Sequence, residues 1–419
     1  MNHTRRVLTG TSIQQYKSLL IINQICRYSL FNTIKTKLMN TSLSSMKLPK
    51  LLSVDDESKI IHKEDAQIDS NVVGGSYRQA LQDIIKHEKR ETSDDSVKST
   101  IDGDMTIISD SVLGSVKVDH PVLDAAAAYF FQISGKRFRP MLVLLVARAI
   151  NKGATPEHIE NIMAKQRKVA ESTEIIHVAS LIHDDIVDGS DTRRGIPSLN
   201  TKFGNKVAVL AGDFLLARSS LTLARLGNIE VVELFSTVIE HLSHGEVLQM
   251  AGKGKQNFDN YMRTIYFKTA SLIAHSCKAA AVLSGAPLHI VEAAYNFGKH
   301  IGIAYQLTDD TLDFTQNEGL LGKPSQGADM RLGISTAPIL YAAKQYPNEM
   351  NELISRKFSN DGDVESAMEF VKKSQAVEHT QDLAASHFKK AVDAALQFEP
   401  SPTRTAMISL IRKIMERDH

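Results

Sequence analysis

Two clusters of aspartates stand out among the residues that can do chemistry. The first reads Asp184-Asp185-Ile186-Val187-Asp188, and the second reads Asp309-Asp310-Thr311-Leu312-Asp313. In a helix, residues four apart share a face, so each cluster would project paired carboxylates from one wall. Neighbouring carboxylates repel and are costly to half-bury, and a hard divalent cation such as Mg²⁺ offsets both effects. Either cluster alone also fits a solvated acidic face, but two with one spacing in Leu- and Ile-rich surroundings favour a metal site.

Basic residues accompany these clusters. Arg binds phosphate through paired hydrogen bonds and Lys binds it as a point charge, so the combination indicates an anionic substrate with phosphates. Taken singly, the Arg pair after the first cluster fits a charged loop, and the Lys after the second fits a turn. Two histidines near the first cluster, His177 and His183, lack zinc-site spacing and are interpreted as core residues. The basic residues are Lys136, Arg137, Arg139, Arg193, Arg194, Lys268 and Lys323.

The elements that must position these groups are helices. From about residue 105 to residue 419, apolar residues recur at spacings of three and four, and alternating strand patterns are scarce. Prolines fall at breaks between these segments, and Pro156 has the place of a first helical residue. This region is predicted to be one all-α domain. Upstream of it, a helix is predicted over 77–90, and the rest of 51–103 is interpreted as a polar, partly disordered spacer.

Composition excludes several classes of protein. Two cysteines, Cys26 and Cys277, rule out a disulfide scaffold or a Cys-based metal site, and a net charge of +1 argues against nucleic-acid binding. The longest clean apolar run, Met141–Ala147, is much shorter than the roughly 18 residues of a membrane span.

The first 50 residues have a different charge from the rest. They carry eight Lys or Arg and no Asp or Glu, a composition typical of a mitochondrial or plastid transit peptide. A secretory signal fits less well, and a disordered basic tail is the alternative. The expected organisation is therefore a transit peptide over 1–50, a spacer over 51–103 and a catalytic domain over 104–419.

Several motifs in order resemble one family. They read GKRFRP (135–140), HDDIVDGSDTRRG (183–195), GDFLLARS (212–219), FKTASLIAHSCKAAAVLSG (267–285) and YQLTDDTLDFTQNEGLLGKP (305–324). This order closely resembles the trans-prenyltransferases, or (E)-polyprenyl diphosphate synthases, over roughly residues 105–419. With the basic leader, the chain is most similar to their mitochondrial long-chain members, such as the hexaprenyl and nonaprenyl diphosphate synthases of ubiquinone biosynthesis.

The resemblance implies an isoprenoid synthase fold, with antiparallel helices around a deep central cavity and the aspartate motifs at its mouth. It implies an allylic diphosphate that ionises and is attacked by isopentenyl diphosphate. By resemblance, the Mg²⁺ ligands are Asp184, Asp185, Asp188, Asp309, Asp310 and Asp313. The allylic diphosphate would contact Arg193, Lys268, Thr269, Gln306 and Lys323, and isopentenyl diphosphate would contact Lys136, Arg139, His177 and Arg194. Direct catalytic roles are expected for Asp184, Asp188, Arg193, Lys268 and Asp309.

Product length is expected to depend on the helix upstream of the first motif. Ala179 and Ser180 precede Asp184 by five and four residues, and an aromatic there would close the pocket. Small residues predict an open pocket and a long product, limited more deeply by residues such as Ile176, unless Ala179 simply packs against a neighbouring helix.

One departure from the family pattern lies near the second motif. Many short-chain members have a Lys where this chain has Ile334, so one cation is missing unless Arg331 replaces it. The alternatives are a short-chain geranylgeranyl diphosphate synthase, a class I terpene cyclase, an inactive partner subunit and a helical scaffold. The expected protein partner is a second copy or a second synthase subunit, and peripheral membrane association is possible. The expected location is the mitochondrial matrix or the matrix face of the inner membrane.

Overall fold

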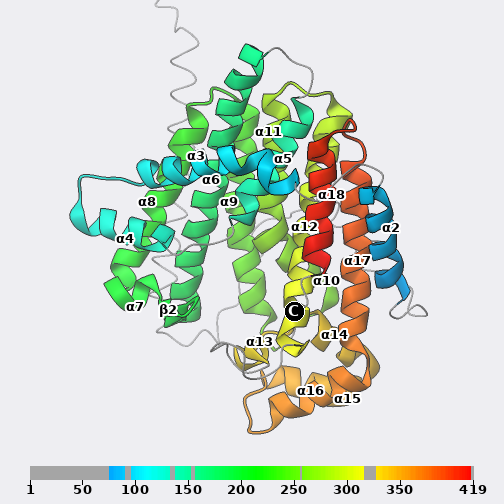
Figure 1. Ribbon diagram of the computed structural model, residues 1–419. Helices are drawn as coiled ribbons and strands as arrows, with labels where there is room; N and C mark the ends of the chain where they lie inside the picture. Colours follow the sequence, from blue (N-terminus) through cyan, green and yellow to red (C-terminus); the bar gives the residue numbers. More distant parts are fainter. Residues whose placement is uncertain are drawn as a thin grey trace, which may run out of the picture. The chain divides into compact units, whose positions relative to one another are not determined.

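The computed structural model describes residues 75–89, 96–132, 137–151, 156–254, 257–315 and 327–416. These residues are almost entirely helical, which confirms the predicted all-α class (Figure 1). The predicted transit peptide lies outside them. In chain order the elements are α2 (Gly75–Lys89), α3 (Ser96–Ser115), α4 (Pro121–Gln132), α5 (Phe138–Ile150), α6 (Pro156–Asp188), β1 (Thr192–Arg193), β2 (Ile196–Pro197), α7 (Leu199–Phe203), α8 (Asn205–Ala224), α9 (Ile229–Gly252), α10 (Phe258–Ile265), η4 (Tyr266–Ala270), α11 (Ser271–Leu283), α12 (Leu288–Thr315), α13 (Ala328–Arg331), α14 (Ala337–Gln345), α15 (Pro347–Ser355), α16 (Asp363–Lys373), α17 (Ala376–Ala395) and α18 (Pro402–Met415).

The described residues fall into two compact units. The first unit contains residues 107–132, 137 and 171–236, and the second contains 75–89, 96–106, 138–151, 156–170, 237–254, 257–315 and 327–416. The long helix α6 contributes to both, with its start in the second unit and its end in the first. It begins at Pro156, as the sequence predicts, because the missing N–H of proline costs nothing in the first turn.

In the first unit, α8 packs on α4 and α7. Its buried side chains, including Leu215 and Leu216, form an apolar core with residues such as Ile175 and Ile176 of α6. The short ribbon β1–β2 follows α6 and pairs antiparallel, with Arg193 opposite Ile196. This unit therefore carries the first aspartate motif (Asp184–Asp188) at the end of a helix that is anchored by its apolar side chains.

In the second unit, α12 lies against α11, η4 and α17. Phe297 of α12 and Phe388 of α17 are fully buried there. A second small core lies where α13 to α16 meet the end of α12, and it includes Phe314 and Met330. These two residues directly follow Asp313 and Asp329, so this core fixes the chain on which both acids are carried.

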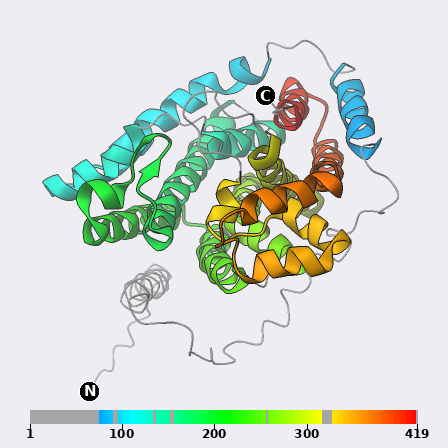
Figure 2. The same ribbon diagram turned by 90° about the horizontal axis from the view of Figure 1, so that it is seen from below.

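Helix α2 confirms the helix predicted over 77–90 and packs on α17 and α18 (Figures 1 and 2). Ala80 and Ile84 are buried, the backbone N–H of Tyr77 donates to Asp382 Oδ1 at 3.1 Å, and the Tyr77 hydroxyl donates to the Met415 carbonyl. The helix α3 begins at Ser96, inside the stretch interpreted as spacer.

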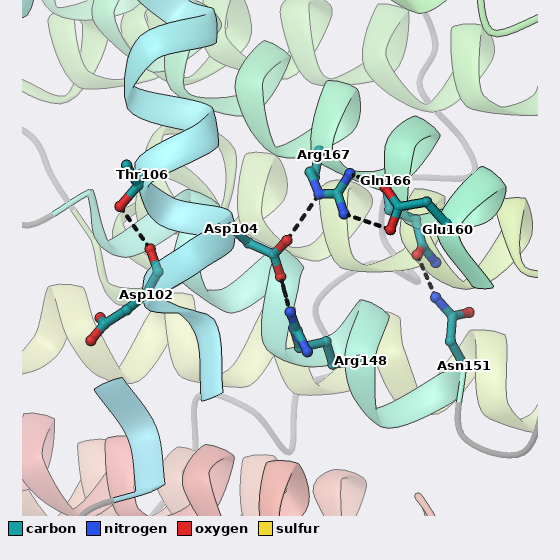
Figure 3. A network of polar contacts seen from close by, with 8 residues as sticks. All are labelled: Asp102, Asp104, Thr106, Arg148, Asn151, Glu160, Gln166 and Arg167. Atoms are coloured by element: carbon teal, nitrogen blue, oxygen red, sulfur yellow. Dashed lines mark hydrogen bonds and ion pairs between the residues drawn. The ribbon is translucent and has the colours of Figure 1, made fainter. Parts of the chain in front are cut away.

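A buried carboxylate ties α3 to α5 and α6 (Figure 3). Asp104 of α3 is 2% exposed, and it accepts hydrogen bonds from Arg148 at 2.7 Å and from Arg167 at 2.9 Å. Arg167 also pairs with Glu160 on its own helix. A buried carboxylate is stable only when it is paired and hydrogen-bonded, and two guanidinium groups meet that need here.

Among the described residues, α8 is the one helix long and apolar enough to cross a membrane by length and composition alone. The sequence did not single out this helix, because its apolar residues do not form one long uninterrupted run. Three charged residues, Lys206, Asp213 and Arg218, lie within the helix, and Leu210 and Leu221 are exposed on it. A core helix of a folded protein meets the same criteria.

Candidate active site

The first aspartate motif divides its carboxylates between two directions. Asp184 and Asp188, one turn apart near the end of α6, are half-buried, whereas Asp185 is 1% exposed. Arg193 donates to both oxygens of Asp185, with Nε at 2.8 Å from Oδ1 and 2.9 Å from Oδ2. Asp185 lies about 100° round the helix from Asp184, so its carboxylate can be buried while the outer two stay half-buried. It serves as an anchor for the following ribbon.

The ribbon β1–β2 brings Arg193 back to the motif. Arg194 and Gly195 form its turn with positive φ angles of 53° and 80°, which suits the glycine and strains the arginine. The Arg194 side chain is exposed. The ribbon therefore separates the two arginines, with Arg193 on the aspartate motif and Arg194 toward solvent.

His183, directly before the motif, is a buried core residue, as the sequence suggested. Its Nε2 lies 3.3 Å from the Val209 carbonyl and 3.6 Å from Asp213 Oδ1. The ring lies so close to Gly212 of α8 that a methyl group there would fall 2.2 Å from Nε2. Burial lowers the pKa of His183, so the ring is held in its neutral form.

The second aspartate motif (Asp309–Asp313) lies near the end of α12. Asp309 is half-buried, whereas Asp310 is 3% exposed and accepts from Gln306 Nε2 at 2.8 Å and from the Tyr261 hydroxyl. Burial, and after it the neighbouring Asp329 carboxylate, raises the pKa of Asp310 to about 8. The middle carboxylate is again an anchor, here held by neutral donors.

Asp313 holds the backbone at a further acidic residue, Asp329, which was not identified from the sequence. Its carboxylate accepts from the backbone N–H of Ala328 at 3.0 Å and of Asp329 at 3.3 Å. Burial, followed by the charges of Asp313 and Asp309, raises the pKa of Asp329 to about 6. The only signal for Asp329 in the sequence was its place in the segment that lacks the family lysine. In that segment, Ile334 is half-buried and Arg331 is exposed.

Lys268 and Thr269 lie on the π-turn η4, between α10 and α11. Lys268 Nζ donates to Glu246 Oε2 at 2.7 Å and to Gln249 Oε1 at 3.0 Å, and both partners are on α9. Such wide turns occur often at functional sites. Glu246 and Gln249 were not predicted, because their role depends on α9 packing against η4.

Two contacts define the surroundings of these residues. Gly245 of α9 makes room for the lysine stem, because a methyl group there would lie 2.6 Å from Lys268 Cγ. Thr269 donates to Gln306 Oε1 at 2.9 Å, so Thr269, Gln306 and Asp310 form one hydrogen-bonded chain. Thr269 and Gln306 therefore connect η4, which also carries Lys268, to the second aspartate motif.

The remaining predicted residues have varied settings. Lys136 and Lys323 lie outside the described residues. Arg139 of α5 and His177 of α6 are half-buried. Ala179 has no exposed area, so it packs against its neighbours, whereas Ser180 is half-buried and donates to the His177 carbonyl at 2.8 Å.

No preformed metal cage exists within the part of the chain that the structure describes. There, no three His, Cys, Asp or Glu side chains are grouped as a ready-made ligand set. Cys277 is buried, and burial raises the pKa of its thiol, so it is unsuited to act as a nucleophile. The chemistry available is carboxylate, ammonium and guanidinium chemistry.

The comparison with protein families decides among the classes left open by the geometry. The polyprenyl synthetase family model matches residues 120–371, which is more than half of the chain. This chain belongs to the polyprenyl synthetase family. As a member it is a prenyltransferase, which removes the generic helical scaffold from consideration.

Individual relatives agree with this assignment. The chain is 41% identical over 362 residues to the probable mitochondrial hexaprenyl pyrophosphate synthase of Neurospora crassa, covering 75% of this chain and 80% of that protein. It is 44% identical over 299 residues to the human all trans-polyprenyl-diphosphate synthase PDSS1, covering 71% of each. The crystal structure of a polyprenyl synthase from Caulobacter crescentus, complexed with calcium and isoprenyl diphosphate, matches with a TM-score of 0.69 and 30% identity over 78% of this chain and 99% of that one.

Proposed function

We propose that this polyprenyl synthetase is a long-chain all-trans-polyprenyl diphosphate synthase. It adds isopentenyl diphosphate to an allylic diphosphate and makes the side chain of ubiquinone. The observation that carries the proposal is the paired aspartate motif. In both copies the middle carboxylate is buried and anchored, while the first carboxylate, Asp184 or Asp309, stays half-buried on its helix. The names of the Neurospora and human relatives support the long product.

The residues fit a hard divalent cation. Asp184, Asp188 and Asp309 present half-buried carboxylate oxygens, which Mg²⁺ prefers as ligands. Burial, and after it the charges of neighbouring carboxylates, raises the pKa values of Asp310 and Asp329, which favours added positive charge near the second motif. The calcium in the Caulobacter structure supports a divalent site. We assign Mg²⁺ binding to the two motifs, with Asp185, Asp310 and Asp313 holding the other carboxylates in place. When bound, Mg²⁺ would withdraw charge from the leaving diphosphate.

The cations of the chain act on the same leaving group. Arg193 and Lys268 are already oriented by carboxylates, so their N–H donors need little reorganisation when an allylic diphosphate binds. Thr269 and Gln306 add neutral hydrogen-bonding groups, and Lys323 adds a further cation. The developing negative charge of the leaving diphosphate is stabilised by these donors, which promotes cleavage of the allylic C–O bond.

The second substrate needs its own cations. We assign Lys136, Arg139, His177 and Arg194 to isopentenyl diphosphate, whose double bond attacks the allylic carbon. The proton that is lost afterwards goes to the departing diphosphate. A class I terpene cyclase has no need for this second set, so incorporation of labelled isopentenyl diphosphate separates the two activities.

Long products require an open path for the growing chain. Ser180 is small and half-buried on the helix upstream of the first motif, where an aromatic residue would block that path. A short-chain geranylgeranyl diphosphate synthase is the second candidate. The deciding experiment incubates the purified chain with Mg²⁺, farnesyl diphosphate and isopentenyl diphosphate and measures product length by mass spectrometry. Products of 20 carbons alone would overturn the long-chain proposal.

For location and assembly, we propose a homodimer in the mitochondrial matrix or at the matrix face of the inner membrane. The exposed Leu210 and Leu221 of the apolar helix α8 support an interface with a second copy. Light scattering of the wild type and of Leu210→Glu tests this. A wild-type monomer overturns the dimer, and an obligatory complex with another synthase subunit replaces it with a heteromer.

A further inference from the structure

Tyr261 joins three helices through a single buried hydroxyl. The residue lies on α10 and is 3% exposed. Its hydroxyl donates to Asp310 Oδ2 on α12, and the backbone N–H of Ala337, the first residue of α14, hydrogen-bonds to it. A buried hydroxyl requires a partner, but it does not require two partners from two other helices. This arrangement is therefore a junction rather than a satisfied core tyrosine.

The junction occupies one of the two oxygens of Asp310. Gln306 Nε2 occupies the other, Oδ1, at 2.8 Å. With both oxygens held, the rotation of α12 about its axis at the motif is fixed relative to α10 and α14. This rotation sets the direction of the side chain of Asp309, the residue directly before Asp310.

The same hydroxyl continues a longer chain of contacts. Thr269 donates to Gln306, Gln306 donates to Asp310, and Tyr261 donates to Asp310. One end of the chain is on the π-turn that carries Lys268, and the other is at the start of α14. Loss of the Tyr261 hydroxyl would leave the Asp310 carboxylate with one donor and would loosen Gln306.

We propose that Tyr261 is a positioning residue of the second aspartate motif, holding Asp310 so that Asp309 and Gln306 are presented to the allylic diphosphate and its metal ion. This inference rests on the proposed role of Asp309. Nothing in the sequence pointed to Tyr261, which lies seven residues before Lys268 and 49 before Asp310.

The ring and the hydroxyl of Tyr261 have separable roles. The ring packs against Phe258, with centroids 5.8 Å apart, and this contact survives in Tyr261→Phe. A matched control is Tyr295→Phe in the same unit. The Tyr295 hydroxyl is hydrogen-bonded to the Tyr266 hydroxyl at 2.7 Å, and neither tyrosine belongs to an aspartate motif.

The test measures both variants in the full chain by thermal unfolding, steady-state kinetics and titration of Mg²⁺. A hydrogen bond to a charged group predicts a fall in kcat of about 10- to 100-fold for Tyr261→Phe, and a several-fold rise in the Mg²⁺ concentration needed for half-maximal rate. Tyr295→Phe should stay within about twofold of wild type, since its hydroxyl lies outside the chain of contacts. A Tyr261→Phe enzyme with unchanged kcat and unchanged Mg²⁺ requirement overturns the proposal, whatever its melting temperature.

Two further variants keep the result unambiguous. The double variant Tyr261→Phe/Asp310→Ala should lose no more activity than Asp310→Ala alone, because removal of the carboxyl group already breaks the contact with the Tyr261 hydroxyl; additive losses overturn the proposal. If Tyr261→Phe does not fold, Asp310→Asn alone must raise the Mg²⁺ requirement, and no rise overturns it. Asp309→Asn tests the underlying site separately: full activity there removes the proposed function of the motif, whereas an inactive Asp309→Asn with a normal Tyr261→Phe removes only the role of Tyr261.

Discussion

The two aspartate motifs have the same spacing but different supports. Asp185 of the first motif is anchored by a charged partner, Arg193, which reaches it from a two-stranded ribbon. Asp310 of the second motif is anchored by two neutral donors, Gln306 and Tyr261. Identical local sequence patterns thus acquire their function from different tertiary surroundings.

The difference has electrostatic consequences. In the first motif, the partner of the buried Asp185 is a charged guanidinium group. In the second, both partners of Asp310 are neutral, and burial raises the pKa of this carboxyl to about 8. Arg193 of the first motif and Gln306 of the second are also proposed substrate ligands, whereas Tyr261 is not. Changes to Arg193 should therefore affect substrate binding more directly than changes to Tyr261.

The largest expected effects come from the first carboxylate of each motif. Asp184→Asn and Asp309→Asn should each lower kcat by about 100- to 1,000-fold, because preorganised charge at the leaving group is lost. Asp188→Asn should cost more than Asp313→Asn, since Asp313 is already engaged with the backbone of Ala328 and Asp329. Steady-state assays at saturating Mg²⁺ check this order. Equal losses for Asp188 and Asp313 would break the comparison.

The charged anchor gives the next effect. Arg193→Lys should lower kcat/KM for the allylic diphosphate by about 10- to 100-fold, because lysine cannot bridge both oxygens of Asp185. Arg225→Lys, an exposed arginine that ends α8 in the same unit, is the matched control and should be neutral. Titration of each substrate in turn measures the two values. A KM change for isopentenyl diphosphate alone would contradict the assignment of Arg193.

Product length should change when the residue four places before the first motif is enlarged, and should not change with the equivalent residue before the second motif. Ser180 precedes the first motif by four residues, and Tyr305, which stacks on Phe138 with centroids 5.0 Å apart, has the same place before the second. Ser180→Phe should shorten the product, whereas Tyr305→Phe should leave it unchanged. Ala179→Phe should instead destabilise the fold by about 1–3 kcal/mol, since Ala179 is fully buried. Mass spectrometry of products and thermal unfolding distinguish these outcomes.

The smallest effect is a pH dependence of stability that originates mainly in the second unit. Burial lowers the pKa of His241 to about 3 and of His275 to about 4, both below the ordinary value of 6.5. The unfolded chain then binds more protons than the folded one as the pH falls below 6.5. Each histidine should cost roughly 1.4 kcal/mol of stability per pH unit below that point. Urea unfolding at pH 7.5 and 5.5 measures this, and His275→Gln should reduce the slope. The raised pKa values of Asp310 and Asp329 give an opposite slope over the same pH range, so the readout is the difference between the wild type and His275→Gln. An unchanged slope in His275→Gln would contradict the buried, neutral state of that ring.

The sequence predicted the parts of the fold and site that depend on local periodicity. The all-α class, the helix over 77–90 and the shared face of Asp184 and Asp188 follow from a repeat of 3.6 residues and from side-chain chemistry. The burial of Asp185 and Asp310 did not follow, because it depends on what packs against the helix one residue further round.

The missed residues share one physical cause. Glu246, Gln249, Tyr261 and Asp329 act through partners that lie far from them in the chain or on another helix. A single buried Tyr or Gln has no periodic signature, and the exposed fraction of a side chain is set by tertiary packing. The motifs therefore indicated the family and the proposed metal site, while the groups that contact the motifs required the structure.

The π-turn η4 has a consequence for how this segment tolerates changes in length. Its backbone closes from the Ser271 N–H to the Tyr266 carbonyl, five residues back, so it holds one residue more than the α-helix on either side. Deleting one residue between them would restore a continuous helix, with α10 and α11 still in phase. We expect the shortened segment to stay helical, with Lys268 and Thr269 turned away by part of a revolution. The directions of these two side chains thus depend on one residue that a continuous α-helix does not need.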